Sequence, residues 1–383
     1  MNSIDLNYSE LDYSELAPAY IRAIAPYQPG KPIAELEREL GISGIVKLAS
    51  NENPLGCSPH AVSAMQEAIK TIALYPDGNG FELKDALAKF FGSKQHTVQH
   101  ANIVLGNGSN DLLELAARAF LTPGDKVVYA DHAFAVYALA TQAVGASGIS
   151  VPATQGYGHD LPAMLQAAIQ NKAKIVFIAN PNNPTGTFLA AAELLEFLRA
   201  LPPQILVVLD EAYNEYLPHN LRYDSVSWLR DFPNLIITRT FSKAYGLAGL
   251  RVGYALADEQ LADMLNRVRQ PFNVNSVAQA AAVAALRDED FVRQTYEMNL
   301  LGMEQVTQGL ALMGLEFIPS FGNFVCFKIA NAAKFYRRLL ELGVIVRPVA
   351  NYAMPDYLRV SIGLKKENEK FLSALMQILG EKQ

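Results

Sequence analysis

Cysteine is scarce in this sequence, with only Cys57 and Cys326 among 383 residues. They lie far apart, and neither has a second ligand at the spacing of a metal site, so the sequence indicates neither a disulfide framework nor a bound metal. No apolar run approaches the roughly 20 residues needed to span a bilayer. The start, MNSIDLNYSELDYSEL, lacks the basic residues and apolar centre of a secretory signal. We therefore expect a cytoplasmic protein without a membrane segment.

Clusters of basic residues are also absent. The formal net charge is -6 at pH 7, and binding to a nucleic-acid backbone requires a clustered basic face. We therefore expect no nucleic-acid partner, although an acidic protein can still hold a small anion in a local pocket. Half of the residues are apolar and 18% are charged, which is typical of a folded protein. The length predicts two domains.

Short β-branched runs alternate with helical patterns in the middle of the chain. Strands are expected at 126–130, 174–180, 204–210 and 234–240, with helical stretches such as 111–121 and 190–201 between them. This alternation predicts an α/β fold whose mostly parallel sheet is covered by helices on both faces. From about residue 288 to 313 a long helix is expected, followed by short strands and a closing helix. That change of pattern predicts a smaller α+β domain.

These patterns divide the chain into three predicted parts. Residues 1–54 form an N-terminal arm and part of the small domain, 55–287 form the large domain that would carry the ligand site, and 288–383 form the small C-terminal domain. The arm includes YIRAIAPYQPGKP, whose prolines disfavour helix. An extended arm of this kind usually packs on another surface, and a partner subunit is one candidate.

Two polar clusters occur at predicted turns beside strands. GNGSND (106–111) places Gly108 and Ser109 just before a helix, where backbone N–H groups and a hydroxyl could hold an anion. An ordinary glycine turn with a helix cap is the alternative, and a Rossmann fingerprint is disfavoured because Asp111 stands where glycine is required. NPNNPTG (180–186) leaves a strand and presents Asn182 and Asn183. Each cluster alone is weak evidence for a binding site.

Two further clusters contain ionisable groups. Asp210 ends an apolar strand, three residues before Tyr213, and a buried carboxylate there needs a cationic partner unless it only caps a helix. Lys243 stands among small and apolar residues in RTFSKAYGLAGLRVGY, and burial would lower its pKa so that the amine could attack a carbonyl. Ser242 and Arg251 could hold a phosphate. The alternative is a solvated lysine with a surface arginine.

Together the four clusters match the requirements of pyridoxal 5'-phosphate, namely an imine-forming lysine, a phosphate cradle and a carboxylate for the pyridine nitrogen. Their order and content resemble the fold-type I aminotransferases. Over nearly the whole chain, from APYQPGKPI and KLASNENPLG through YPDGNG to YLRVSIG, the sequence is similar to the histidinol-phosphate aminotransferases of the class II subfamily. The resemblance implies the fold-type I fold, this cofactor, and a homodimer with shared active sites.

The resemblance also implies roles for individual residues. Lys243 would bind the cofactor covalently, and Asp210 would pair with the pyridine nitrogen. Tyr213 and Asn183 would contact the ring 3'-oxygen, and Asn183 would also contact the substrate. The other implied cofactor contacts are Gly108, Ser109, Asn110, Ser242 and Arg251 around the phosphate and Phe134 stacked on the ring. Tyr75 in LYPDGNG would cross from the partner subunit to the cofactor phosphate, and Tyr27 in APYQPG would reach the partner's substrate.

The implied reaction is amino transfer between L-histidinol phosphate and 2-oxoglutarate in histidine biosynthesis. In this class Arg359 of YLRVSIG would grip a substrate carboxylate, but histidinol phosphate has none, so its phosphate must take that place. Arg347 is a plausible second guanidinium for the dianion, unless it is an ordinary strand-end charge. An aromatic amino-acid (Phe/Tyr) aminotransferase and a decarboxylase of the threonine-phosphate type stay open. A ligand-binding regulatory module is disfavoured, because 383 residues leave no room for a DNA-binding domain.

Overall fold

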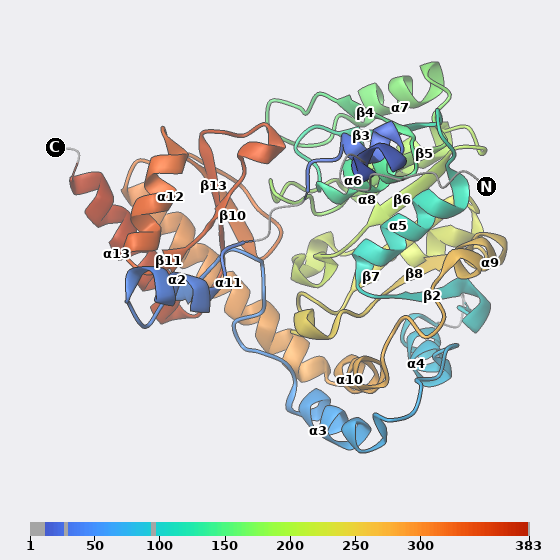
Figure 1. Ribbon diagram of the computed structural model, residues 1–383, viewed down its shortest axis with the longest axis horizontal. Coiled ribbons are helices and arrows are strands. Elements are labelled where there is room, and N and C mark those ends of the chain that lie inside the picture. The colour runs from blue at the N-terminus through green and yellow to red at the C-terminus, as the bar shows by residue number, and fades with distance from the viewer. Residues whose placement is uncertain (1–11, 27–29, 93–96, 382–383) are drawn as a thin grey trace, which may run out of the picture.

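The computed structural model describes residues 12–26, 30–92 and 97–381. A seven-stranded sheet with its helices forms one part of the molecule, and two smaller sheets with their helices form the other (Figure 1). The long helix α11 (Glu289–Leu312) runs from the larger part toward the smaller one. Within the described residues no helix combines the length and the apolar character that crossing a membrane requires.

The large sheet is mixed but mostly parallel. Its strands lie in the order β2 (Ile103–Gly106), β8 (Gly253–Ala257), β7 (Leu235–Thr240), β6 (Leu206–Asp210), β5 (Ile175–Ala179), β3 (Lys126–Ala130) and β4 (Ser147–Val151). β8 runs antiparallel to both of its neighbours, whereas every other neighbouring pair is parallel. The four strands predicted from the sequence all form, and β2, β4 and β8 are additional. The predicted α/β fold is confirmed.

Each central strand is buried on both faces. In β6, Val207 and Leu209 belong to one apolar core and Val208 to the other, because successive side chains of a strand point to opposite faces. The first core includes α4 (Phe81–Phe91), α7 (Leu161–Gln170), α8 (Ala191–Ala200) and α10 (Ser276–Leu286), with α3 (Pro59–Ala68) packed against α10. The second core includes α5 (Ser109–Phe120), α6 (Val136–Ala143) and α9 (Glu259–Val268). Burial on both faces explains why these strands read as continuous apolar runs.

The smaller part contains two sheets. The antiparallel sheet has the order β12 (Arg347–Pro348), β13 (Tyr357–Ser361), β10 (Phe324–Lys328) and β9 (Phe317–Ile318), and β1 (Val46–Lys47) pairs in parallel with β11 (Val344–Ile345). Their core also takes side chains from α11, α12 (Ala332–Glu341) and α13 (Lys365–Gly380). The long helix and the closing helix occur as predicted. The domain boundaries after residues 54 and 287 stay a prediction.

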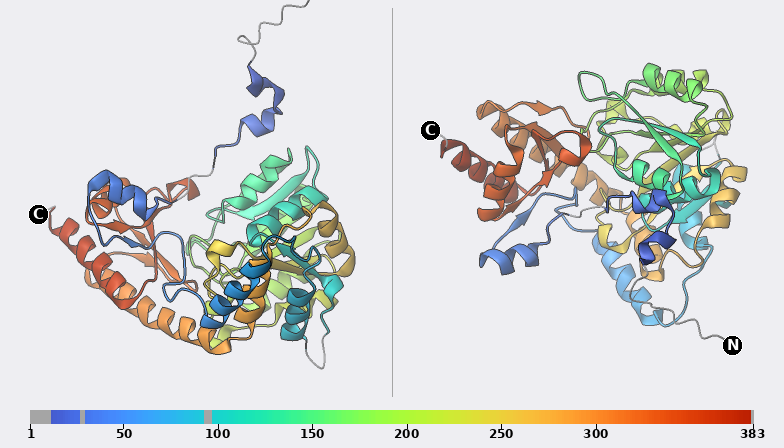
Figure 2. Two further views of the ribbon diagram at one scale, coloured as in Figure 1. Left: turned by 60° about the horizontal axis from the view of Figure 1, so that its bottom comes forward. Right: turned by 45° about the horizontal axis from the view of Figure 1, so that its top comes forward.

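The N-terminal segment is less extended than its prolines suggest. It contains the short helix α1 (Ala19–Arg22) and the eight-residue helix α2 (Ile33–Leu40). The expectation of an extended arm was wrong for α2, because Pro32 occupies its N-cap position, where no backbone N–H is required. Residues 12–26 project from the body (Figure 2) and contact α6, where Gln142 Nε2 donates to the Tyr20 carbonyl at 3.4 Å.

Candidate functional site

A cavity of about 270 Å³ lies at the carboxyl ends of the parallel strands. Its walls come from the segments that follow β2, β3, β5, β6 and β7, from residues 49–51, and from β12 and β13 of the smaller part. Parallel strands end at the same edge of a sheet, so polar residues far apart in the sequence meet there. The lining residues include Ser109, Asn110, Phe134, Asn183, Asp210, Tyr213, Ser242, Lys243, Arg251, Arg347 and Arg359.

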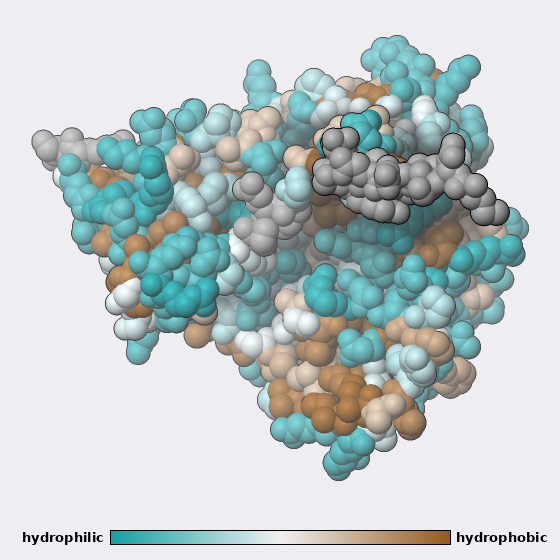
Figure 3. Space-filling model, viewed as in Figure 1, coloured by the Kyte–Doolittle hydropathy of each residue, from teal (hydrophilic) through white to brown (hydrophobic). Residues whose placement is uncertain are grey.

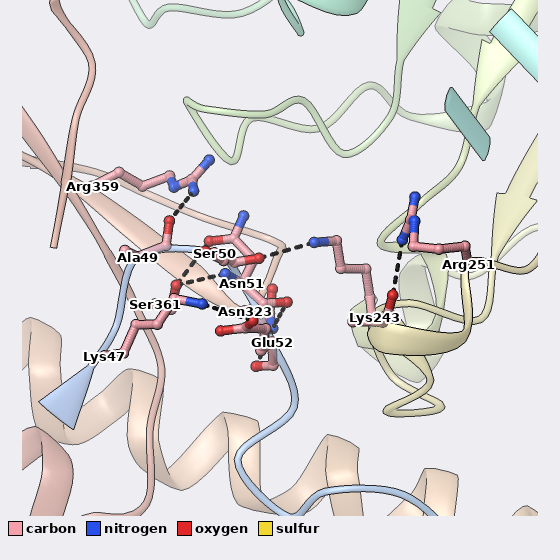
Figure 4. Close-up of polar contacts among 11 residues, drawn as sticks. Lys47, Ala49, Ser50, Asn51, Glu52, Lys243, Arg251, Asn323, Arg359 and Ser361 are labelled. Atoms are coloured by element: carbon pink, nitrogen blue, oxygen red, sulfur yellow. Dashed lines mark hydrogen bonds and ion pairs between the residues drawn. The ribbon is translucent and has the colours of Figure 1, made fainter. Parts of the chain in front are cut away.

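Lys243 follows β7 and directs its amine across this cavity. Its Nζ donates to the Ser50 carbonyl at 3.0 Å (Figure 4) and lies 5.8 Å from the centre of the Tyr213 ring. Burial lowers the pKa of the amine to about 7, and the positive charges of Arg359 and Arg251 act in the same direction. Near neutral pH a large fraction of this amine is therefore uncharged, as nucleophilic attack on a carbonyl or proton abstraction requires.

Asp210 is the last residue of β6. Its carboxylate accepts hydrogen bonds from the Tyr137 hydroxyl at 2.9 Å and from Thr238 Oγ1 at 3.2 Å. Burial raises the pKa of this carboxyl to about 6, although both hydrogen bonds lower it. Because both donors are neutral hydroxyls, a cationic ligand beside Asp210 would strongly stabilise the carboxylate. A protonated pyridine nitrogen is such a ligand.

An anion-binding corner forms where α5 begins. Gly108 precedes the helix with φ 83°, and a Cβ at this position would lie 2.5 Å from Arg251 Nη2. The Arg251 guanidinium also donates to Ser242 Oγ at 3.3 Å and to the Asn107 carbonyl at 3.4 Å. Backbone N–H groups at a helix N-terminus beside an arginine and serine hydroxyls are suited to a phosphate group. Ser109 and Asn110, in the first turn of α5, line the same cavity.

Three uncharged side chains complete the wall near Asp210 and Lys243. Tyr213 is buried, which raises the pKa of its phenol to about 12, and its hydroxyl accepts a hydrogen bond from Asn51 Nδ2 at 2.9 Å. Asn183 Oδ1 accepts from Arg359 Nη1 at 2.5 Å. Phe134 follows β3 and lines the cavity. The phenol, amide and aromatic ring could contact the oxygen and the face of a bound pyridine ring.

Arg347 and Arg359 are cross-strand partners. They occupy directly opposed positions in the antiparallel pair β12–β13, and both line the cavity. Arg359 is buried and donates to the Ala49 carbonyl at 2.8 Å, while its Nε has no hydrogen-bond partner within the part of the chain that the structure describes. Like charges directly opposite each other destabilise a sheet. An anionic ligand between the two guanidinium groups would remove that penalty.

Two of the predicted residues that the structure describes, Gly108 and Tyr75, do not line this cavity. Tyr75 is 84% exposed and stacks on Phe272 with ring centres 4.9 Å apart, and it does not line the cavity of its own chain. Tyr27 lies outside the described residues. In the other direction, sequence reasoning assigned no role to Asn51 or Tyr137, which contact Tyr213 and Asp210. Asn51 lies within the motif KLASNENPLG, and Tyr137 follows Phe134 by three residues, so both residues lie within or beside motifs that already indicated the site.

Comparison with solved structures defines the class of protein. The chain superposes on histidinol-phosphate aminotransferase from Sinorhizobium meliloti, solved in complex with pyridoxal-5'-phosphate, with a TM-score of 0.86 and 30% identity over 95% of this chain and 98% of that chain. Thermus thermophilus aspartate aminotransferase, in a double-mutant form, shares the fold with a TM-score of 0.80 at 23% identity, over 94% of this chain and 99% of that chain. The fold is that of the fold-type I aminotransferases.

Sequence comparison narrows the class to a family. The model of the family "Aminotransferase class I and II" matches residues 43–375. Histidinol-phosphate aminotransferase from Methylobacillus flagellatus is 63% identical over 95% of this chain and 98% of its own length, and histidinol-phosphate aminotransferase 2 from Nitrosospira multiformis is 59% identical over 95% and 92%. The chain belongs to the class I and II aminotransferases and, within them, to the histidinol-phosphate aminotransferase family.

Proposed function

We propose that this protein catalyses reversible amino transfer between L-histidinol phosphate and 2-oxoglutarate, giving imidazole acetol phosphate and glutamate, in histidine biosynthesis. The observation that carries the proposal is the cross-strand pair of Arg347 and Arg359 in the same cavity as Lys243. A phosphate dianion suits two guanidinium groups, which can each form paired hydrogen bonds with its oxygens. The names of the near-full-length relatives support the same substrate.

The proposed cofactor is pyridoxal 5'-phosphate, and the residues present fit it. Ser109, Ser242 and Arg251 would hold its phosphate, because they meet at the start of α5, where the Arg251 guanidinium donates to Ser242 Oγ and also approaches Gly108. Asp210 would face the ring nitrogen and Lys243 the aldehyde carbon. The bound cofactor supplies an electron sink that stabilises negative charge at the substrate Cα. The remaining chemistry belongs to side chains of this protein.

Lys243 would move the proton. With a pKa of about 7 its amine is partly neutral at neutral pH, so it can accept a proton from the substrate Cα and return it to another carbon. Asp210, whose pKa is about 6, is mainly ionised under the same conditions and would keep the ring nitrogen protonated. Tyr213 and Asn183 would orient the ring through its oxygen, with Phe134 against its face.

A homodimer with shared active sites is part of the proposal. Exposed apolar side chains gather between α3 and α4, including Ile72, Leu74, Tyr75 and Phe81, which are 57%, 71%, 84% and 62% exposed. Figure 3 shows this region as a brown area at the lower edge of the molecule. A contiguous apolar patch of this kind is typical of a protein interface. A second subunit covering it would bring Tyr75 of one chain toward the phosphate corner of the other. The cytoplasmic location also stays a prediction.

Substrate comparison tests the proposal. Specificity is measured by the ratio of the kcat/KM values of competing substrates. With 2-oxoglutarate as acceptor, we expect kcat/KM to be highest for histidinol phosphate. Equal or higher kcat/KM values for phenylalanine or tyrosine would indicate an aromatic amino-acid aminotransferase instead. Release of carbon dioxide from threonine phosphate would indicate a decarboxylase. The purified protein should also show the visible absorption band of a lysine-bound cofactor and lose it in Lys243→Ala. A band that survives this substitution would refute the assignment of Lys243.

A further inference from the structure

Three consecutive residues of the N-terminal segment each contact a different functional group of the cavity. The Ala49 carbonyl accepts from Arg359, the Ser50 carbonyl accepts from Lys243, and the Asn51 amide donates to Tyr213, at 2.8, 3.0 and 2.9 Å. Figure 4 shows this segment between the arginine and the lysine. Two of these contacts are made by backbone carbonyls, which any residue would supply. The third depends on the asparagine side chain.

The backbone and the side chain of Asn51 both form hydrogen bonds with buried neighbours. It is 1% exposed and has a left-handed backbone with φ 54°. Its backbone N–H donates to Ser361 Oγ at 2.8 Å, and its carbonyl accepts from Asn323 Nδ2 at 3.1 Å. Ser361 Oγ in turn donates to Asn51 Oδ1 at 2.9 Å. The side-chain amide is therefore clamped between Ser361 on β13 and the Tyr213 hydroxyl.

The Ser361 hydroxyl determines which way this amide faces. A hydroxyl has one proton, and giving it to Asn51 Oδ1 directs the NH₂ group of Asn51 toward Tyr213. An NH₂ group can only donate, so the Tyr213 oxygen must accept and its own proton is directed elsewhere. If the amide turned around, Oδ1 would take the Tyr213 proton, and the Ser361 proton would face an NH₂ group. In the observed orientation the Ser361 proton has Asn51 Oδ1 as its acceptor, and one Nδ2 proton of Asn51 has the Tyr213 oxygen.

We propose that Asn51, held by Ser361, is a positioning residue that keeps the Tyr213 hydroxyl proton available to the oxygen of the bound cofactor ring. The inference rests on the proposed function, because the proton matters only if that cofactor binds beside Tyr213. A proton donated to the ring oxygen stabilises negative charge there. This stabilisation lowers the pKa of the nitrogen that joins Lys243 to the cofactor. A change at the Asn51 amide should therefore shift the pH at which the absorption spectrum of the bound cofactor changes.

The experiment is a pH titration of the visible absorption band of the holoenzyme. Asn51→Gly removes the amide, and glycine adopts φ 54° without strain, so the backbone carbonyls at 49–51 keep their places. The titration gives the pKa of the nitrogen that joins Lys243 to the cofactor, which is called the band pKa below. It should rise by about 0.5 to 1 in Asn51→Gly, as expected for loss of one hydrogen bond, and by about 1 to 2 in Tyr213→Phe. Ser361→Ala should shift it in the same direction, because the amide can then turn.

A matched control is Asn331→Gly. Asn331 also has a left-handed backbone, with φ 60°, but it is exposed at the start of α12, away from the cavity. Its titration should match that of the wild type. A band pKa unchanged in both Asn51→Gly and Ser361→Ala would overturn the inference and leave the proposed function standing. If Asn51→Gly does not load cofactor, Ser361→Ala decides alone. A wild-type protein without the band would overturn both proposals.

Discussion

Replacing Arg347 with methionine should change the substrate preference more than the overall activity. Methionine keeps an unbranched apolar stem but removes the guanidinium, so a phosphate bound between Arg347 and Arg359 would lose one of its two charged partners. A hydrogen bond to a charged group contributes about 1.5 to 3 kcal/mol. Each 1.36 kcal/mol corresponds to a factor of about ten in rate. We therefore expect kcat/KM for histidinol phosphate to fall about 10- to 150-fold.

Phenylalanine should respond differently to the same substitution. Its carboxylate is a monoanion that a single guanidinium can hold in a paired geometry, and Arg359 is the more buried of the two arginines. Its kcat/KM should change less than about threefold, so the preference for histidinol phosphate should drop by at least several-fold. Removing one of two opposed positive charges should not destabilise the fold. Urea unfolding of the apoprotein checks this last point.

The assay follows glutamate formation from 2-oxoglutarate with each amino donor at several concentrations. Arg337→Met provides the matched control, since Arg337 is an exposed arginine on α12 and its loss changes the net charge by the same amount. This control should leave both values of kcat/KM unchanged. Equal losses for histidinol phosphate and phenylalanine in Arg347→Met, or no loss for either, would refute the two-arginine account of specificity.

Three further predictions follow from the site. Because burial lowers the pKa of Lys243 from its ordinary value of 10.5 to about 7, the unfolded chain binds more protons than the folded apoprotein between these values. The free energy of unfolding of the apo wild type, minus that of Lys243→Met, should therefore rise with pH across that window. Urea titrations of both proteins at pH 7.5 and 10 measure this difference, and the same difference at both pH values would contradict the prediction. Asp210→Asn should lower kcat about 100-fold or more with little change in KM, since it removes a preorganised charge; steady-state kinetics would show an unchanged kcat if Asp210 only stabilises the fold. Mixing inactive Lys243→Ala and Tyr75→Ala chains should restore roughly a quarter of the wild-type activity, because half of randomly mixed dimers carry one intact shared site; no recovery in verified hybrids would exclude the crossing of Tyr75.

Local patterns in the sequence predicted much of the architecture. The apolar runs that became β3, β5, β6 and β7 are continuous because those strands are buried on both faces. Polar residues directly after such runs, as at Asp210 and Lys243, mark strand ends, and strand ends of a parallel sheet share one edge. Prolines were less informative, since Pro32 caps a helix that the prolines of this segment were expected to disfavour. A proline's effect depends on its position within the turn, which composition does not reveal.

The sequence by itself therefore determined the strand and helix order, the residues at the strand ends, and the resemblance that points to a transaminase. The tertiary structure decided the electrostatics and the partners of those residues. The lowered pKa of Lys243 and the raised pKa of Asp210 arise from burial, which only packing creates. The cross-strand pairing of Arg347 with Arg359 and the clamp of Ser361 on Asn51 join residues 12 and 310 positions apart. No local pattern encodes such contacts, because they depend on how two separately built sheets and the N-terminal segment meet around one cavity.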